Sequence, residues 1–316
     1  MNVPVAITVQ DLSHVYGRRQ ALRGLTLRIE SGEVFVLLGP NGGGKTTLFR
    51  ILSTLIPQQS GEIRVLGMDL RTQMAEIRAK IGVVFQAPSL DRKLTVSENI
   101  SHQAALYGLS GTSMRHRRDE LLEHFSLLDR AGELVEKLSG GLRRRVEIAK
   151  GMIHRPQLLL LDEPSTGLDP GARSDLWQYL RRLREEQRVT IVLTTHLLEE
   201  ADHADRIAIL HEGTLVALDS PEVLRQSVGG DSITIETGTP DELARDIQQT
   251  LALQPQVMDE TVRLEVPNGH QWIARIVEAF PGRISAIRLG KPTLEDVFIA
   301  RTGHRFWRQR PEATHA

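Results

Sequence analysis

The chain has no cysteine, few aromatic residues and no long apolar run. Zero cysteines exclude disulfides, thiolate metal sites and cysteine nucleophiles. No apolar stretch approaches the roughly 18 to 20 residues that span a bilayer, and the start MNVPVAITVQ lacks the charged region and long apolar core of a signal peptide. We therefore expect a protein that stays in the cytoplasm, where it can still dock on a partner that spans the membrane.

The charge of the chain is nearly balanced. A net charge of −1 gives no global electrostatic reason to expect nucleic acid as a partner. A length of 316 residues, with 40% hydrophobic and 25% charged residues, is typical of a soluble globular protein with about two domains.

The clearest motif is GPNGGGKTT, Gly39 to Thr47, which follows the apolar run Val34 to Leu38. It fits the phosphate-binding pattern G-x-x-x-x-G-K-[ST] in the required context of strand, loop and helix. Glycines let backbone N–H groups turn toward an anion, and Lys45 adds a full charge for the β- and γ-phosphates. Thr46 is expected to place its hydroxyl on Mg²⁺. The alternative is a glycine-rich turn that binds nothing.

Upstream of this loop, residues 5–10 and 25–29 are short β-branched and apolar runs separated by SHVYGRRQ. They predict strands of an antiparallel flap with a polar loop between them. Tyr16 lies in that loop and is a candidate to stack on an adenine ring. Covering a strand edge is the alternative role for this side chain.

Downstream, LFRILSTLI after Thr47 carries apolar residues on one helical face, and this helix is expected to stop at Pro57. Short strands are expected at 62–66 and 81–85, the second followed by Gln86. From Thr95 to about Arg155 the pattern is helical, which predicts a helical insert at about 87–155 in an α/β core.

The run LLLLDEP, Leu158 to Pro164, predicts a strand that is buried on both faces of a parallel sheet. Acidic residues at its carboxyl end lie where open α/β sheets bind ligands. Asp162 can hold Mg²⁺ from the side opposite Thr46, and Glu163 can orient or deprotonate an attacking water. A solvated Asp-Glu pair in a loop is the alternative.

The stretch VTIVLTTH, Val189 to His196, repeats this arrangement, with His196 at the end of a β-branched strand. A lone histidine is usually an ordinary surface or core residue, and its place at another strand end is what makes it a candidate. RIAILHEGTLVALDSP then predicts a hairpin with its turn at Glu212-Gly213 and a stop at Pro221.

Six motifs follow one another in a fixed order: GPNGGGKTT, Gln86, LSGG at Leu138 to Gly141, LLLLDEP, STGLD at Ser165 to Asp169, and His196. Across roughly residues 5 to 220, this set resembles the nucleotide-binding subunit of an ATP-binding cassette (ABC) transporter. The LSGG motif separates that family from other P-loop NTPases, such as kinases and small GTPases.

The resemblance implies a role for each matching residue. Tyr16 would stack on adenine, Gln86 would sense the γ-phosphate, Mg²⁺ and the membrane subunit, and Asp162 would bind Mg²⁺ through water. The implied catalytic residues are Lys45, Gln86, Glu163 and His196, and the implied metal-binding residues are Thr46, Gln86 and Asp162. The implied ATP-binding residues of the same chain are Tyr16, Gly39, Pro40, Asn41, Gly42, Gly43, Gly44, Lys45, Thr46 and Thr47.

Other residues would act on a second copy. In this family two cassettes close head to tail, so Ser139, Gly140 and Gly141 would complete the phosphate site of the opposite subunit, and Asp169 would lie across the same interface. A helix N-terminus with small residues suits close approach to an anion. A homodimer is the simpler expectation, because one chain carries both sets of residues.

The sequence departs from the commonest family pattern in two places. Gly43 stands where Ala or Ser is usual, and this extra backbone freedom is expected to cost some loop order. The LSGG motif continues into Leu142 and the triplet Arg143 to Arg145, as in the drug-resistance and lipid or polysaccharide export branch. We interpret the triplet as a solvated helix face, with one or two residues toward nucleotide or partner, and not as a nucleic-acid patch.

After about Asp231 a β-α-β-α-β order predicts a small α+β module. It ends in KPTLEDVFIARTG, Lys291 to Gly303, which resembles the C-terminal motif of the drug-resistance exporter branch. The tail after it is expected to be a frayed terminus. The alternative is that Arg305, Phe306, Trp307 and Arg308 touch lipid headgroups or a partner.

Together these observations predict an α/β fold: a P-loop NTPase of the ABC type, with a RecA-like core, an antiparallel β flap and a helical insert, followed by a small C-terminal α+β domain. The expected domains are 4–222 (ATPase) and 229–303 (accessory), with 304–316 as a tail. The expected function is ATP hydrolysis with Mg²⁺, at the cytoplasmic face of the membrane, driving an integral membrane transport subunit, as an exporter. The alternatives are a soluble ATPase of the same fold acting on ribosomes or DNA, and a regulatory ATP-binding module.

Overall fold

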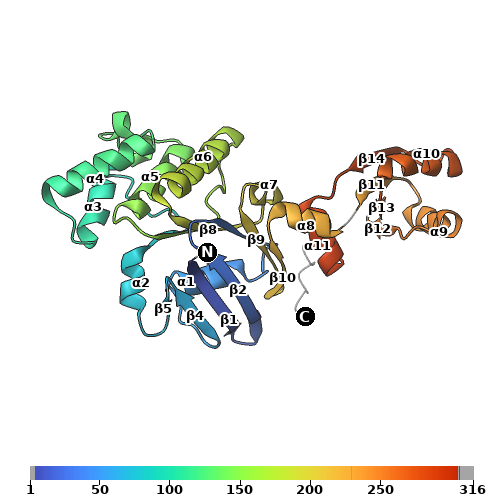
Figure 1. The fold of residues 1–316 in the computed structure, drawn as a ribbon. Coiled ribbons are helices and arrows are strands. Elements are labelled where there is room, and N and C mark those ends of the chain that lie inside the picture. Colours follow the sequence, from blue (N-terminus) through green and yellow to red (C-terminus); the bar gives the residue numbers. More distant parts are fainter. Residues whose placement is uncertain (1–3, 229, 305, 307–316) are drawn as a thin grey trace, which may run out of the picture. The chain divides into compact units, whose positions relative to one another are not determined.

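The structure, a computed structural model, describes residues 4–228, 230–304 and 306 (Figure 1). The chain separates into two compact units, with the division between Leu218 and Asp219. The first unit contains an antiparallel sheet, a largely parallel sheet and a group of helices, and the second contains a smaller antiparallel sheet with helices.

The antiparallel sheet of the first unit contains the predicted flap. Its spatial order is β2 (Arg19–Glu30), β1 (Val5–Tyr16), β4 (Glu62–Val65) and β5 (Met68–Asp69). The expectation that SHVYGRRQ forms a polar loop is wrong, because β1 and β2 pair as far as Tyr16 opposite Arg19. Only Gly17 and Arg18 form the turn, so Tyr16 is the last residue of a strand.

The largely parallel sheet forms the centre of the first unit. Its spatial order is β10 (Thr214–Asp219), β9 (Arg206–His211), β3 (Val34–Leu38), β8 (Thr190–Thr195), β7 (Leu158–Asp162) and β6 (Ile81–Val84). The strands β9, β3, β8, β7 and β6 pair with one another in parallel. Every residue of β3, β7 and β8 is buried, as their continuous apolar runs predict. The carboxyl ends of these strands therefore meet at one edge of the sheet.

Helix α1 (Lys45–Leu52) follows β3 and packs its apolar face into a core shared by both sheets. It begins two residues before the expected Thr47 and ends before Pro57, with Gly44 as its N-cap. The other helices of this unit are α2 (Met74–Lys80), α3 (Val96–Leu106), α4 (Gly111–His124), α5 (Gly140–Met152), α6 (Pro170–Gln187) and α7 (Leu198–Ala201). Helices α3, α4 and α5 lie together, drawn in green tones in Figure 1, and confirm the helical character predicted for this segment.

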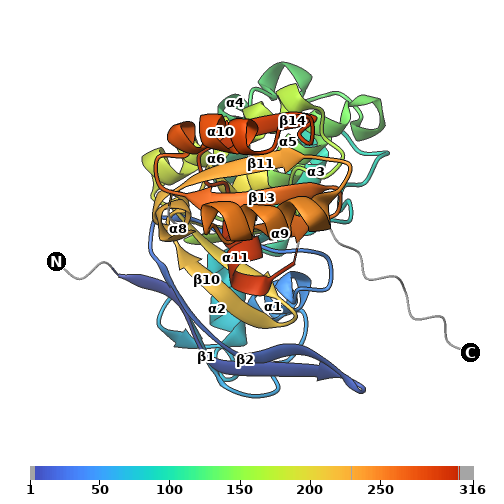
Figure 2. The same ribbon diagram turned by 90° about the vertical axis from the view of Figure 1, so that its right-hand side faces the viewer.

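The second unit begins with α8 (Pro221–Val228) and has a sheet of spatial order β12 (Gln256–Met258), β13 (Thr261–Val266), β11 (Asp231–Glu236) and β14 (Ala286–Gly290). Helices α9 (Pro240–Leu251) and α10 (Gly269–Ala279) cover one face of it, as Figures 1 and 2 show. Ile233 and Ile235 of β11 pack there against Leu243, Ile247 and Ile276 of these helices. The predicted β-α-β-α-β order is confirmed, with β12 as an additional short strand.

Helix α11 (Leu294–Thr302) carries the C-terminal motif and packs against α8. Thr293 and Asp296 form a capping box at its start, and the buried carboxylate of Asp296 pairs with Arg263 of β13. Phe306 is only 1% exposed and meets the ring of Phe298 edge-on. A frayed terminus is therefore wrong for Phe306, whereas Arg305, Trp307 and Arg308 lie outside the described residues.

Candidate functional site

The phosphate loop, Gly39 to Gly44, joins β3 to α1. Some of its glycines are required by backbone conformation and others by close packing. Gly42 (φ 82°) and Gly44 (φ 105°) adopt the left-handed conformation that disfavours other residues. Gly39 and Gly43 lie against the backbone of β9: a Cβ on Gly39 would overlap the carbonyl oxygen of Leu210, and one on Gly43 would lie 2.9 Å from it. Gly43 therefore has a steric reason in this chain, the close approach of β9.

Lys45 is the first residue of α1, and its side chain returns along the loop. Its ammonium donates to the carbonyl oxygens of Gly39 (2.7 Å) and Pro40 (3.0 Å), and the residue is only 4% exposed. Burial lowers the pKa of Lys45, while the carboxylates of Glu163 and Asp162 act in the opposite direction. Thr46 and Thr47 follow it in the first turn of α1, so the loop presents a buried cation, a helix N-terminus and two hydroxyls.

Asp162 ends β7 and is oriented by the neighbouring strand β8. The hydroxyl of Thr194 donates to Oδ1 of Asp162 at 2.6 Å and accepts the backbone N–H of Glu163 at 2.9 Å. Burial raises the pKa of Asp162, and the Thr194 hydrogen bond and the nearby charges of Arg50 and Lys45 partly offset this. The carboxylate is thus fixed in direction at the carboxyl edge of the sheet, where the sequence predicted it.

Glu163 leaves the strand in the left-handed conformation (φ 42°), and three side chains meet its carboxylate. Gln86 donates to Oε2 at 3.3 Å, Thr166 donates to the same oxygen at 3.1 Å, and Nδ1 of His196 lies 3.1 Å from Oε1. These partners come from the ends of β6 and β8 and from the segment after β7. The structure therefore gathers Gln86, Glu163 and His196 from three distant parts of the sequence.

The LSGG motif opens α5 as expected. Ser139 is the N-cap and its hydroxyl accepts the N–H of Leu142, while Gly140 and Gly141 form the first turn. A Cβ on Gly141 would come within 2.8 Å of the Ala172 side chain of α6, so glycine is required by packing within the chain. Asp169 caps α6 by accepting the N–H of Ala172 at 3.0 Å. Ser139 and Asp169 thus both have a structural role as helix caps.

Tyr16 is 44% exposed at the end of β1, where its ring meets that of His14 edge-on with centroids 4.7 Å apart. Exposure leaves a face of the ring free for stacking on another ring. This geometry agrees with both roles considered for Tyr16.

The arginine triplet after LSGG is not the solvated helix face that the sequence suggested. Arg144 is only 8% exposed, and its guanidinium donates to backbone carbonyls at the ends of β6 and β7. Arg145 pairs with Asp175 of α6, and Arg143 donates to the carbonyl of Leu138. The charge pattern gave no sign of this, because burial of an arginine depends on which carbonyl groups the fold places around it.

Thr166 and Thr194 were missed by sequence reasoning. The signal for Thr194 exists in the strand VTIVLTTH, since it is a polar residue within a run of buried ones. The hydrogen bond from Thr194 to Asp162 depends on the register that places the two residues side by side in neighbouring parallel strands. That register follows from strand order, which the motif alone does not give.

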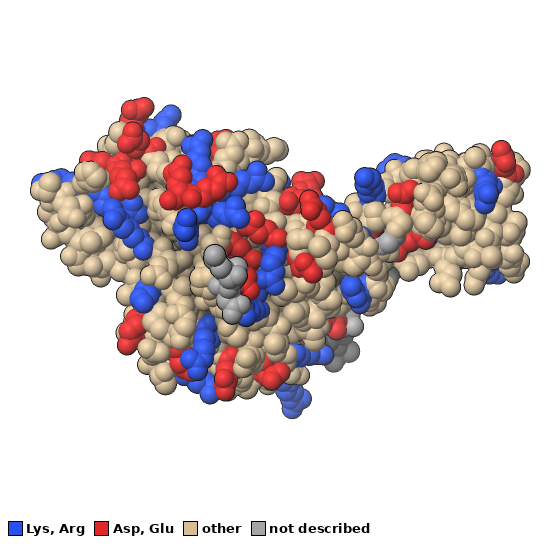
Figure 3. All heavy atoms as spheres, viewed as in Figure 1, with Lys and Arg blue, Asp and Glu red and all other residues tan. Residues whose placement is uncertain are grey.

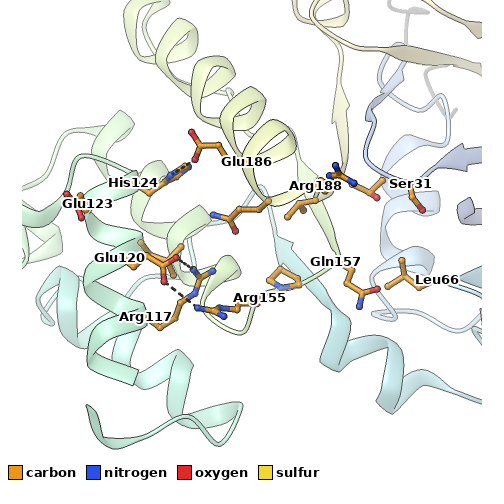
Figure 4. A pocket seen from close by; sticks show the side chains of 15 residues that line it. Ser31, Leu66, Arg117, Glu120, Glu123, His124, Arg155, Gln157, Glu186 and Arg188 are labelled. Carbon is orange, nitrogen blue, oxygen red and sulfur yellow. Dashed lines mark ion pairs between the residues drawn. The ribbon is translucent and has the colours of Figure 1, made fainter. Parts of the chain in front are cut away.

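The first unit has a cleft beside the site and a larger one away from it. One, of about 380 Å³, lies beside the site and is lined by Gln86, Glu163 and Thr166 together with Arg144 and Glu147 of α5. The other, of about 850 Å³, lies near the amino ends of β7 and β8 (Figure 4). Several charged side chains that line it form ion pairs: Arg117 and Arg155 pair with Glu120, and His124 pairs with Glu186. None of the residues that line the larger cleft belongs to the motifs, so this cleft is separate from the candidate site.

Within the described ranges, no helix is long and apolar enough to cross a membrane. The same ranges contain no cluster of three or more His, Asp or Glu side chains that could hold a metal ion by themselves. On the face in Figure 3, acidic and basic side chains are interspersed over the first unit.

Comparisons with known proteins show which family this chain resembles. A family model described as ABC transporter matches residues 22–166. The daunorubicin resistance ATP-binding protein DrrA2 of Streptomyces coeruleorubidus is 38% identical over 309 residues, which cover 95% of this chain and 96% of that protein. The Nod factor export ATP-binding protein I of Rhizobium johnstonii is 38% identical over 304 residues, which cover 95% and 96%.

Solved structures show the same fold. Protein cbiO1 from Clostridium perfringens, described as part of the ABC transporter complex cbiONQ, matches with a TM-score of 0.67 at 28% identity, over 79% of this chain and 96% of that chain. The dimeric bacterial ABC transporter cassette MJ0796 matches with a TM-score of 0.62 at 30% identity, over 68% and 98%.

The phosphate loop at the carboxyl edge of a parallel sheet defines a P-loop nucleotide hydrolase, and the flap and helical insert are those of an ATP-binding cassette. Because the chain is 38% identical to DrrA2 over 95% of its length, it belongs to the ABC transporter family. Within that family it is an ATP-binding and ATP-hydrolysing subunit, as the motifs predicted.

Proposed function

We propose that this chain lies at the cytoplasmic face of a membrane and powers an exporter formed with an integral membrane partner. The relatives support export, since one is named for drug resistance and the other for Nod factor export. The alignment with DrrA2 spans 309 residues and therefore extends beyond the 218 residues of the first unit into the second. We propose a drug, lipid or polysaccharide-like compound as the class of transported substrate.

We also propose the domain boundaries expected from the sequence. Residues 4–222 form the ATPase domain, 229–303 an accessory domain, and 304–316 a tail. The division between Leu218 and Asp219 into two compact units supports a boundary close to residue 222.

The carboxylate of Glu163, with Gln86 and His196 in contact, carries the proposal for hydrolysis. Glu163 orients or deprotonates the water that attacks the γ-phosphate, because it follows β7 at the carboxyl edge of the sheet, near enough for its charge to act on Lys45 of the phosphate loop. Gln86 and His196 hold this carboxylate on its two oxygens and contact the γ-phosphate. Lys45 stabilises the charge that develops on the phosphates, and Gly39 to Thr47 supply N–H groups to the triphosphate. Tyr16 stacks on the adenine.

The residues present suit Mg²⁺ as the companion of ATP. Asp162 and Thr46 offer a carboxylate and a hydroxyl oxygen, which are ligands that Mg²⁺ takes together with phosphates and water. The Thr194 hydroxyl already fixes the direction of the Asp162 carboxylate. Gln86 adds an amide oxygen to this set. A Mg²⁺ ion held by these residues would neutralise charge on the phosphates.

We propose a homodimer in which each site is shared. Ser139, Gly140 and Gly141 at the start of α5 face the γ-phosphate of the opposite copy, and Asp169 lies across the same interface. The N-terminus of α5 carries a partial positive charge and its glycines allow close approach, which suits an anion. Ser139 serves as a cap within its own chain, and the dimeric cassette MJ0796 supports the arrangement.

The test of catalysis is Glu163→Gln. This change keeps the shape and one acceptor oxygen but removes the base, so kcat for ATP is expected to fall by about 10²-fold or more while ATP binding is retained. The control is Glu199→Gln, an exposed glutamate on α7. Turnover measured with both variants decides the role: unchanged hydrolysis in Glu163→Gln would remove this carboxylate from the mechanism.

The test of transport is the partner. Extraction of the full chain in mild detergent is expected to recover it with a protein of several membrane-spanning helices. The rival function, a soluble ATPase acting on ribosomes or DNA, predicts recovery with nucleic acid instead. The net charge of −1 and the interspersed charges in Figure 3 favour the membrane partner.

A further inference from the structure

One buried arginine on α5 joins several parts of the site. The guanidinium of Arg144 donates to the carbonyl of Phe85 (2.9 Å), directly before Gln86, and to the carbonyl of Asp162 (3.1 Å). It also donates to the carbonyl of Pro164 at 2.8 Å and to the carboxylate of Glu147 at 2.7 Å. The planar fork of arginine suits such simultaneous contacts, which a lysine ammonium does not reproduce. The backbone on both sides of Glu163 is therefore fixed to α5.

The same face of α5 holds the other end of the segment that contains Gln86. We name residues 85–89 the Gln86 loop. Glu147 accepts the N–H of Ser89 at 2.9 Å, and Lys150 donates to the carbonyl of Ser89 at 2.7 Å. Arg144, Glu147 and Lys150 are spaced by three residues, so they lie along one side of the helix. The Gln86 loop is thus attached to α5 at its first and last residues.

Helix α5 begins at Gly140, directly after its N-cap Ser139, and the proposed function places both residues on the phosphate of the opposite copy. Because a helix moves as a rigid element, a shift of this N-terminus also displaces the side chains farther along the helix. Arg144 and Glu147 line the cleft of about 380 Å³ together with Gln86 and Glu163. The geometry thus provides one continuous connection from the LSGG motif to the catalytic carboxylate.

We propose that Arg144 and Glu147 are positioning residues for ATP hydrolysis. They hold the Gln86 loop and the backbone around Glu163 at a set distance from the LSGG helix, so that the carboxylate and the start of α5 are aligned together. The inference rests on the proposed roles of Gln86 and Glu163, and it predicts an effect on turnover and not on ATP affinity.

The chain contains a closely matched control on α4. Arg117 is 6% exposed and Arg144 is 8% exposed, and each pairs with a glutamate three residues later, Glu120 and Glu147. Arg117 also donates to a backbone carbonyl, that of Met152 at the end of α5. It differs in lining the larger cleft, away from the Gln86 loop. The two arginines are thus alike in their own burial and in a glutamate three residues later, although the side chain of Glu120 is 43% exposed and that of Glu147 only 6%.

The first experiment compares Arg144→Gln with Arg117→Gln in the full chain. Arg144→Gln is expected to lower kcat by about tenfold or more with the Kd for ATP changed less than about threefold, because only alignment is lost. Arg117→Gln is expected to leave both close to those of the natural chain. Arg144→Lys is expected to fall between, since it keeps the charge but not the fork. Equal kcat in Arg144→Gln and Arg117→Gln would overturn the inference.

The second experiment uses no activity and covers the case in which Arg144→Gln does not fold. Hydrogen exchange of the backbone amides in the Gln86 loop is compared between Glu147→Ala and Glu120→Ala. Loss of the charged acceptor for the Ser89 N–H is expected to speed exchange in the loop by about tenfold in Glu147→Ala only. Equal exchange in the two variants would overturn the attachment itself. If the natural chain hydrolyses no ATP, the proposed function fails, while the exchange result still stands for the loop.

Discussion

At the scale of residues, Asp162 is the proposed metal ligand and lies in an environment that disfavours its charged form. Burial raises the pKa of its carboxyl, so the folded chain binds this proton more tightly than the unfolded chain does. The stabilising contribution of the group is full below its ordinary pKa and is lost as the pH rises through the raised value. Near neutral pH the charged carboxylate therefore lowers the free energy of unfolding.

Asp162→Asn is thus expected to stabilise the chain while stopping hydrolysis. The amide oxygen still accepts from Thr194, but no charge is buried. Urea unfolding without nucleotide or Mg²⁺ should show a gain over the natural chain near neutral pH, and the gain should shrink at acidic pH. Asp129→Asn, at an exposed aspartate, serves as the control. A less stable Asp162→Asn at neutral pH would contradict the expectation, since stability and function would then not oppose each other here.

The residues of the site differ in how far the sequence reveals them. Lys45, Asp162 and Glu163 stand in motifs whose residue types follow directly from phosphate and water chemistry, and the structure places them at one sheet edge. Arg144 and Thr194 act through backbone carbonyls and strand register. Those contacts depend on tertiary packing, so a charge triplet or a strand composition does not predict them.

At the scale of elements, the periodic patterns predicted the types of strands and helices but not the extent of each. The buried strands β3, β7 and β8 were predicted correctly, because short continuous apolar runs are typical of strands buried on both faces. The flap was underestimated, because Tyr16 and Arg19 pair within a polar stretch that has no apolar alternation to mark it. Helix α1 starts at Lys45, earlier than the predicted Thr47, for a related reason. The left-handed Gly44 ends the loop, and hydrophobic periodicity carries no information on backbone conformation.

Helix α5 shows how one element serves two roles. Its start, with the N-cap Ser139 and Gly140, is the part proposed to approach the phosphate of the opposite copy, and its next turns carry Arg144 and Glu147 toward the Gln86 loop. Seven of its thirteen residues are buried, including this charged pair, so the helix is firmly packed. Such packing makes a helix suitable for carrying a displacement from one end to the other.

At the scale of the whole molecule, one chain carries both halves of a site, but the proposed arrangement uses them in different subunits. The phosphate loop with Lys45 belongs to one copy, and Ser139 at the start of α5 belongs to the other. Ser139 is the N-cap of its helix, so a test substitution has to keep that cap. Asp is a good N-cap residue and adds a negative charge where the γ-phosphate is proposed to lie.

Mixing two inactive variants tests this arrangement. Lys45→Ala is expected to weaken ATP binding, and Ser139→Asp is expected to repel the phosphate of the opposite copy, so each alone should hydrolyse little ATP. In a mixed dimer both defects fall in one site, and the other site is intact. With equal amounts about half of the dimers are mixed, and recovery of up to about a quarter of the natural ATPase activity is expected. Ser139→Asn, which keeps the cap without the charge, controls for damage to α5. If mixing restores no activity although the subunits exchange, each site is completed within its own chain and the shared arrangement is wrong.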